Sequence, residues 1–286
     1  MERQGNHMAQ TVEEILSAAK RAGASDVHIT VGIPPKMRVN GKLITMEGER
    51  LMPADTMVIA ESVMNENQKQ RFDEKGEVDM SFAIAGEGRY RVNVYKQRGS
   101  AAMAFRLVDT VVPAPEALGV PASVIDLKKK KRGLILVTGP TGSGKSTTLA
   151  AIIDKINNNR EAHVITLEDP IEYLHQHKQA IVNQREIGLD TMSYANALRA
   201  ALREDPDVIL VGEMRDFETI SVAITAAETG HLVLSTLHTI GAASTVDRVI
   251  DVFPPHQQQQ IRVQLANVLE AVISQQLIPM IGGKGR

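Results

Sequence analysis

The pattern of apolar and polar positions changes near the middle of the chain, which indicates two domains. In the first 108 residues short alternating runs dominate, and two of them flank Asn40-Gly41, a pair typical of tight hairpins. A second hairpin is expected around 86–88, and helices are expected over 12–19 and 55–72. We therefore predict a small mixed α+β domain over residues 1–108.

The second half contains short, almost wholly apolar runs separated by helical segments. Four runs are expected to be strands: 133–138, 162–167, 208–211 and 231–236. Runs buried on both faces are typical of a parallel sheet with helices on each side. Apolar residues from Ile261 to Ile273 recur at helical spacing, so another helix is expected there. A proline-bearing stretch, 109–121, is expected to link the first domain to an α/β domain over 122–286.

Composition narrows the classes of function. The net charge of −2 over 286 residues provides no general attraction for nucleic acid or for an anionic membrane. The chain has no cysteine, which excludes disulfides, thiolate zinc sites and a cysteine nucleophile. No apolar run approaches the roughly 20 residues of a membrane helix, and the N-terminus lacks a signal-peptide pattern. We expect a soluble cytoplasmic protein, with an added leader at 1–7 and a flexible tail at 282–286.

Residues 139–146 carry the strongest chemical signal, because Gly-Pro-Thr-Gly-Ser-Gly-Lys-Ser matches a phosphate-binding P-loop at every required position. Its glycines let backbone N–H groups turn toward phosphates, and the following helix directs its positive end at them. Lys145 would compensate the charge of the outer phosphates, and the Ser146 hydroxyl would bind magnesium. We predict ATP and Mg²⁺ as ligands. The binding loop is predicted to comprise Gly139, Pro140, Thr141, Gly142, Ser143, Gly144, Lys145, Ser146 and Thr147.

Two apolar runs end in acidic residues, as strands leading to a catalytic crevice do. Glu213 follows 208–211, with Gly212 where many P-loop proteins place Asp, and is expected to hold Mg²⁺ through water or to polarise the attacking water. Glu168 follows 162–167 and is predicted to be the general base or to orient the water. Asp169-Pro170 would also suit a helix start, with Asp169 as N-cap, and both interpretations can hold.

A further apolar run carries a histidine at each end. His238 lies at its C-terminal end and is predicted to reach the terminal phosphate of the nucleotide. His231 lies at the other end and is interpreted as structural.

Four segments together, 139–147, 165–173, 203–216 and 230–239, resemble the Walker A, Asp, Walker B and His boxes of the secretion-ATPase superfamily of type II secretion and type IV pili. Segments 23–28 and 89–93 resemble the PAS-like domain of pilus-retraction ATPases. The resemblance covers residues 12–279. It implies a RecA-like P-loop ATPase domain with a parallel sheet, preceded by a PAS-like domain.

The resemblance also implies an assembly and a function. Members form hexameric rings with ATP between the N-terminal domain of one subunit and the P-loop domain of its neighbour. Glu168 and Glu213 would be the essential acids and His238 the His-box residue, while Arg91 and Arg106, with Arg89 as a further candidate, would reach the phosphates. The implied function is ATP-driven retraction of type IV pili, at the inner face of the cytoplasmic membrane and against a membrane platform protein.

Two departures from the family pattern bear on this function. Extension and secretion relatives carry a four-cysteine zinc element, which a chain without cysteine lacks, and this favours retraction. The chain also ends before the helical C-terminal portion of retraction ATPases, so truncation or a short paralogue is expected. The alternatives are an extension or secretion ATPase without zinc and an ATP-binding regulatory paralogue. A nucleic-acid translocase is disfavoured, because few aromatic residues are available for stacking.

Overall fold

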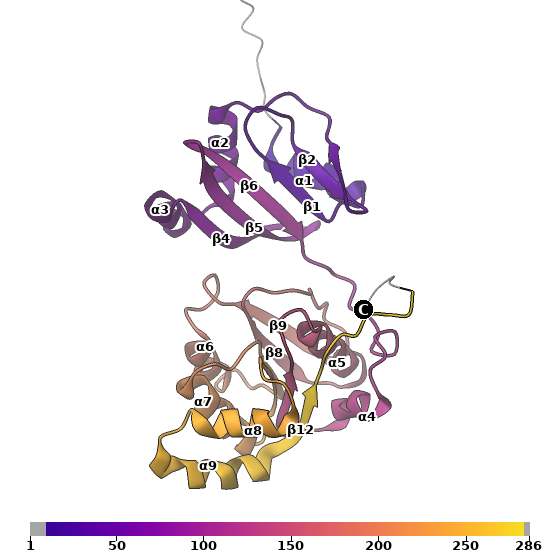
Figure 1. Cartoon of the computed structure of the whole chain (residues 1–286), viewed down its shortest axis with the longest axis vertical. Coiled ribbons are helices and arrows are strands. Elements are labelled where there is room, and N and C mark those ends of the chain that lie inside the picture. The colour runs from indigo at the N-terminus through magenta and orange to yellow at the C-terminus, as the bar shows by residue number, and fades with distance from the viewer. Residues whose placement is uncertain (1–9, 283–286) are drawn as a thin grey trace, which may run out of the picture. The chain divides into compact units, whose positions relative to one another are not determined.

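The computed structural model describes residues 10–282, which divide into two compact units between Val108 and Asp109 (Figure 1). The predicted leader at 1–7 and the tail from 283 onward lie outside the described residues. The α/β fold class is confirmed: an antiparallel sheet with helices comes first, and a parallel sheet with helices on both faces follows.

The N-terminal unit is a six-stranded antiparallel sheet in the order β3-β2-β1-β6-β5-β4. Its strands are β1 (Asp26–Ile29), β2 (Lys36–Val39), β3 (Lys42–Thr45), β4 (Glu77–Ile84), β5 (Gly88–Gln97) and β6 (Ser100–Leu107). Both predicted hairpins are present. Asn40 and Gly41 join β2 to β3 with φ of 49° and 80°, the left-handed conformation that a two-residue hairpin turn requires.

The helices of this unit are α1 (Val12–Arg21), α2 (Pro53–Val63) and α3 (Glu66–Lys75). The single helix expected over 55–72 was wrong, because a new helix starts at Asn65. The Asn65 side chain accepts a hydrogen bond from Gln68 N at 2.9 Å, and Gln68 Oε1 accepts one from Asn65 N at 2.8 Å. This reciprocal cap satisfies backbone groups that a continuous helix would pair internally, so it begins α3.

The second unit contains a six-stranded parallel sheet in the order β12-β7-β11-β10-β8-β9. Its strands are β7 (Gly133–Thr138), β8 (His163–Glu168), β9 (Ile181–Glu186), β10 (Val208–Val211), β11 (Leu232–Leu237) and β12 (Leu269–Ser274). Four of these strands were predicted, and the two edge strands were not. The helix expected to continue to Ile273 ends at Val268, because residues from Leu269 pair with β7 instead.

Helices cover both faces of the parallel sheet (Figure 1). On one face lie α4 (Ala122–Ile125), the 3₁₀ helix η1 (Asp126–Lys129) and α5 (Lys145–Asn159), packed against residues such as Ile135. On the other lie α6 (Tyr194–Ala201), α7 (Phe217–Glu228), α8 (Ala242–Asp251) and α9 (Pro255–Val268), packed against residues such as Leu134. Neighbouring strand residues thus face opposite layers, and both layers are apolar. Among residues 10–282 no helix combines the length and apolarity needed to cross a bilayer.

Candidate active site

The C-terminal ends of the parallel strands and the start of α5 surround a cavity of about 510 Å³. Parallel α/β sheets bind ligands at this edge, because their connecting loops open there. The cavity brings together one residue from each predicted motif. These are Lys145, Glu168, Glu213 and His238.

The loop between β7 and α5 has the backbone conformation that its glycines allow. Gly139, Gly142 and Gly144 have φ of 149°, 78° and 87°, a region that favours glycine. Space is a second constraint at two of them. A Cβ on Gly139 would lie 2.1 Å from Gln275 O, and one on Gly144 would lie 2.8 Å from Gln275 Nε2. The loop is therefore shaped partly by the segment that follows β12.

Lys145 lies at the first position of α5 with its side chain curled toward the loop. Its Nζ donates hydrogen bonds to Gly139 O and Pro140 O, both at 3.0 Å. Burial lowers the pKa of this ammonium, and the negative charges of Glu213 and Glu172 oppose that change. Of the other predicted loop residues, the cavity is lined by Thr141, Gly142, Gly144, Ser146 and Thr147.

Glu168 ends β8 and faces the same cavity. Its Oε2 accepts hydrogen bonds from Thr166 Oγ1 at 2.6 Å and from Gln184 Nε2 at 3.0 Å. Burial raises its pKa above that of an ordinary carboxyl group, although the two hydrogen bonds act in the opposite direction. The helix start considered at Asp169-Pro170 is wrong, because the chain after Glu168 continues as an irregular loop.

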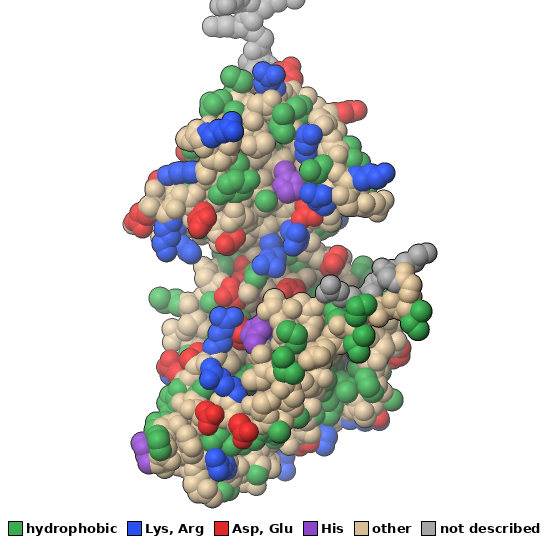
Figure 2. Space-filling view, in the orientation of Figure 1, with side chains coloured by type: hydrophobic (Ala, Val, Ile, Leu, Met, Phe, Trp, Pro, Cys, Tyr) green, Lys and Arg blue, Asp and Glu red, His purple; other side chains and the backbone are tan. Residues whose placement is uncertain are grey.

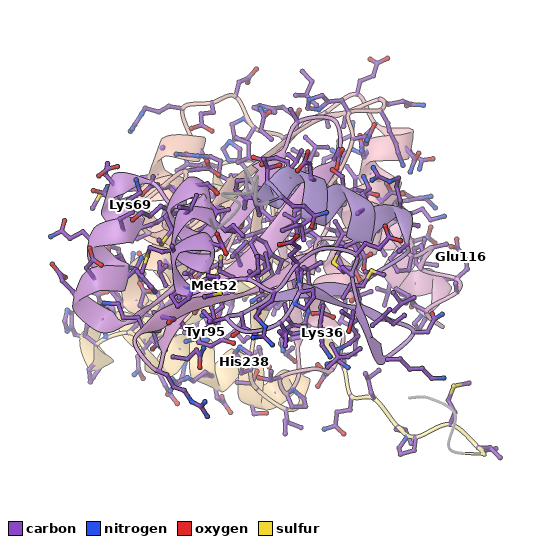
Figure 3. All side chains as sticks on the ribbon, turned by 90° about the horizontal axis from the view of Figure 1, so that it is seen from above. Lys36, Met52, Lys69, Tyr95, Glu116 and His238 are labelled. Atoms are coloured by element: carbon purple, nitrogen blue, oxygen red, sulfur yellow. The ribbon has the colours of Figure 1, made fainter. Side chains whose placement is uncertain are left out.

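Glu213 follows β10 and meets His238 from the end of β11. Glu213 Oε1 lies 2.8 Å from His238 Nε2 and 2.5 Å from Arg215 Nε. The oxygen is buried, and within the described chain none of these contacts has the alignment of a hydrogen bond. His238, labelled in Figure 3, is 42% exposed and borders the cavity.

Gly212 occupies a position where a side chain would crowd its neighbours. A Cβ there would lie 2.9 Å from Tyr194 Oη and 3.0 Å from Leu167 O. This crowding disfavours the aspartate that many P-loop proteins have at this position.

The predicted metal ligands fit magnesium only in company with a nucleotide. Among residues 10–282 no group of three or more acidic or histidine side chains could hold a metal ion. Magnesium, however, commonly takes one or two protein ligands and completes its octahedron with water and phosphate oxygens. The buried, unaligned Oε1 of Glu213 and the Ser146 hydroxyl on the cavity wall suit that mode.

The predicted arginines lie on the N-terminal sheet, on the face away from its core. Arg106 is opposite both Arg91 and Asp26, and Asp26 is opposite Arg38, so these four side chains form one row across four strands. Arg106 Nε contacts Asp26 Oδ1 at 2.9 Å. Burial tends to raise the pKa of Asp26, but hydrogen bonds from Ser25 and Arg106 outweigh it, so this pKa is lowered.

The same face of the sheet carries further basic side chains beside this row. Arg91 and Arg106 are both exposed, and Lys36, labelled in Figure 3, lies next to Arg38 in register with His28. Basic side chains are spread over the visible face of this unit, with acidic ones between them (Figure 2). Arg89 is two residues from Arg91 on β5, and therefore on the same face.

Several residues in or beside the cavity escaped the sequence analysis. Thr166 and Gln184 contact Glu168, Tyr173 Oη lies 3.3 Å from Thr147 Oγ1, and Gln275 contacts the P-loop. Only Thr166 carried a usable signal, since it lies two residues before Glu168 on a predicted strand and therefore shares its face. His231, interpreted as structural, places Nδ1 3.0 Å from Ala226 O at the end of α7.

The profile of the family described as "Type II/IV secretion system protein" matches residues 2–285. The chain belongs to this family. It is 48% identical over 272 residues to the type IV pilus retraction ATPase PilT of Pseudomonas aeruginosa. The matched segment covers 95% of this chain and 79% of that protein. It is 49% identical over 252 residues to a twitching motility protein of Neisseria gonorrhoeae, covering 88% of this chain and 67% of that protein.

A solved structure agrees with these sequence matches. The crystal structure of the pilus retraction motor PilT with bound ADP superposes with a TM-score of 0.87 at 54% identity, covering 96% of this chain and 80% of that one. The chain is therefore a nucleotide-binding P-loop ATPase of the type II/IV secretion family. The prediction of an ATPase is confirmed.

Proposed function

We propose that this family member powers the retraction of type IV pili by hydrolysing ATP in the cavity at the end of the parallel sheet. The observation that carries the proposal is the convergence of the P-loop lysine, two carboxylates and a histidine on one cavity. The similarity to PilT and to a twitching motility protein supplies the link to pili.

The triphosphate would lie along the P-loop, with Lys145 exchanging its two carbonyl partners for phosphate oxygens. The positive end of α5 favours the same anions. Glu168 would take a proton from the attacking water, or orient that water, because its carboxylate is held at the cavity wall and its raised pKa makes it a stronger base. His238 beside Glu213 would sense the terminal phosphate.

Mg²⁺, bound with the nucleotide, would neutralise charge on the phosphate oxygens. Ser146 and Glu213 are the groups proposed to hold it, Glu213 through water. Charge that develops on the phosphoryl group calls for a further cation, and an arginine fork spreads its charge over several oxygens. Arg91 and Arg106 are proposed for this role, acting on the nucleotide of a neighbouring subunit.

That arrangement requires a ring, and we propose that the ring is a hexamer. Residues 1–108 are proposed to be its PAS-like domain. The working position would be the inner face of the cytoplasmic membrane, with an inner-membrane platform protein as the partner that receives the movement. The support for the shared site is chemical. The N-terminal sheet has two exposed arginines opposite each other, Arg91 and Arg106, and every predicted acid of the site belongs to the second unit.

The test measures both ATPase activity and twitching motility. The wild-type chain and Lys145→Ala are each produced in a bacterium whose own retraction ATPase gene is deleted, and the purified proteins are assayed for ATPase activity. We expect the wild type to hydrolyse ATP and restore twitching, and Lys145→Ala to do neither while its circular dichroism spectrum stays unchanged. ATP binding without turnover would instead identify the regulatory paralogue, and increased surface piliation without twitching would identify an extension motor.

A further inference from the structure

Glu168 is held by two polar side chains to which the sequence analysis assigned no role, one from its own strand and one from the edge of the sheet. Thr166 precedes Glu168 by two residues on β8 and therefore lies on the same face. Gln184 of β9 is directly opposite Thr166 in the parallel register, so its side chain emerges beside both. Thr166 is buried and Gln184 is half-buried.

Both side chains donate to the same carboxylate oxygen. Thr166 Oγ1 lies 2.6 Å and Gln184 Nε2 lies 3.0 Å from Glu168 Oε2. Two donors on Oε2 restrict the rotation of the carboxylate, which also accepts a backbone hydrogen bond from Glu172. A general base needs a fixed geometry toward the water that it activates, and two side-chain donors on one oxygen help to supply it.

Gln184 also connects this carboxylate with the loop that closes the cavity wall. Its Nε2 donates to Tyr173 O at 2.8 Å, and its Oε1 accepts from His175 N at 2.8 Å. Tyr173 in turn reaches Thr147 of α5, with 3.3 Å between the two hydroxyl oxygens. One amide thus fixes the base and the loop that contacts the P-loop helix.

We infer that Thr166 and Gln184 are positioning residues that orient Glu168 for water activation by binding its Oε2. The inference deepens the proposed function and rests on the assignment of Glu168 as the base. Removing either donor should lower kcat by roughly tenfold or more, because hydrogen bonds to charged groups are among the strongest in proteins. KM for ATP should change little, since neither side chain belongs to the P-loop.

The pH profile gives a second signature. Several titratable groups line the cavity with Glu168. They are Asp169, Glu172, Tyr173 and His175 from the following loop, Lys145 of α5, Tyr194 of α6, Glu213 after β10, and His238 after β11. The two donors lower the pKa of Glu168 against the effect of burial. Their loss therefore raises this pKa further, and activity that needs the ionised base is lost at a higher pH. The acid limb of kcat should move upward by about one pH unit for each lost donor.

The experiment uses the full chain, with Thr166→Val, Gln184→Met and Glu168→Gln. Asn183→Met is the matched control, because Asn183 neighbours Gln184 on β9 but is exposed and contacts His163 instead. We would measure kcat and KM for ATP from about pH 5 to 9 and the melting temperature of each variant. Thr166→Val is nearly isosteric and removes the hydrogen bond that the Thr166 hydroxyl donates to Glu168. It therefore tests the inference even if Gln184→Met folds poorly.

The expected result is a reduced kcat with an upward-shifted acid limb in both Thr166→Val and Gln184→Met, and wild-type behaviour in Asn183→Met. A wild-type acid limb in Thr166→Val, together with an inactive Glu168→Gln, would overturn the inference while leaving Glu168 as the base. Wild-type turnover in Glu168→Gln would instead refute the assignment of the base in the proposed function.

Discussion

At the scale of single residues, two carboxylates at the ends of neighbouring strands have different surroundings. Glu168 is held by two neutral donors, whereas Glu213 meets the basic side chains of His238 and Arg215. A neutral environment suits a group that exchanges protons with water, and a charged one suits a group that handles cations and phosphates. The two acids therefore have distinct predicted roles.

Glu168→Gln is expected to lower kcat by roughly 10²–10⁴, the usual contribution of a general base, with nucleotide affinity retained. Glu213→Gln is expected to raise the magnesium concentration that half-activates the enzyme. Because burial raises the pKa of Glu168, wild-type kcat should fall with decreasing pH above the usual carboxyl range. Steady-state kinetics against pH and magnesium, with fluorescent nucleotide binding, separates these effects. Equal losses of affinity and turnover in Glu168→Gln would contradict the prediction.

Gly212 is a residue whose environment disfavours a side chain. Replacing it with Asp, which is the usual Walker B residue, should destabilise the fold by about 1–3 kcal/mol, because the new Cβ would crowd Leu167 O and Tyr194. The melting temperature of Gly212→Asp should fall, and Gly212→Ala should show most of the same loss. An Asp variant with unchanged stability and higher turnover would show that the position tolerates a standard Walker B acid.

At the scale of elements, β12 contributes more than an additional edge to the sheet. Gln275 directly follows β12; its Nε2 donates to Ser143 O at 2.6 Å, and its Oε1 accepts from Thr148 Oγ1 at 2.8 Å. Gln275 N also donates to Thr138 O at 2.8 Å. Gln275 therefore holds the P-loop by hydrogen bonds just before its start, near its end, and at the first turn of α5.

Gln275→Leu should weaken nucleotide affinity by roughly tenfold through loss of this support, since the loop backbone must be preorganised to bind phosphates. The neighbouring variant Gln276→Leu is the control, because Gln276 is exposed. Calorimetric titration with ADP would provide the measurement. Equal affinity in the two variants would show that the loop keeps its shape without Gln275.

At the scale of the whole molecule, two units carry complementary parts of the proposed chemistry. The N-terminal unit presents exposed Arg91 and Arg106, and the second unit holds the P-loop and the carboxylates. If the arginines act on a neighbour's nucleotide, activity depends on assembly and not on either unit alone. Arginine fingers of this kind raise turnover by roughly 10³–10⁵.

Mixed rings test this arrangement. Arg106→Ala subunits have an intact P-loop, and Lys145→Ala subunits have intact arginines, so each alone should be inactive. Mixing them should restore part of the ATPase activity, because some interfaces then pair one good P-loop with one good arginine. If the mixed rings form, as native mass spectrometry would show, and no activity returns, Arg106 acts within its own subunit or is structural. Arg98→Ala, in the turn between β5 and β6, is a control for loss of a nearby charge.

Local chemistry explains which features the sequence determined by itself. The P-loop lies in eight consecutive residues between an apolar run and a helix, and strand ends such as Glu168 and Glu213 follow directly from buried runs. Hairpin turns and helix caps, such as Asn40-Gly41 and Thr11 with Glu14, also depend on neighbours within a few residues. These features could be predicted because short-range sterics and hydrogen bonds specify them.

Long-range contacts decided the rest. Residues Leu269–Ser274 fit a helical pattern equally well, and only the unpaired edge of β7 makes them a strand. The polar strand β9 lacks a clear periodicity, so Gln184 beside Glu168 was invisible until the sheet aligned the two strands. Gln275 meets Ser143 across 132 positions of the chain. Backbone pairing and side-chain contacts over such separations depend on the folded chain as a whole, so only the tertiary structure determines which side chains orient the base and support the P-loop.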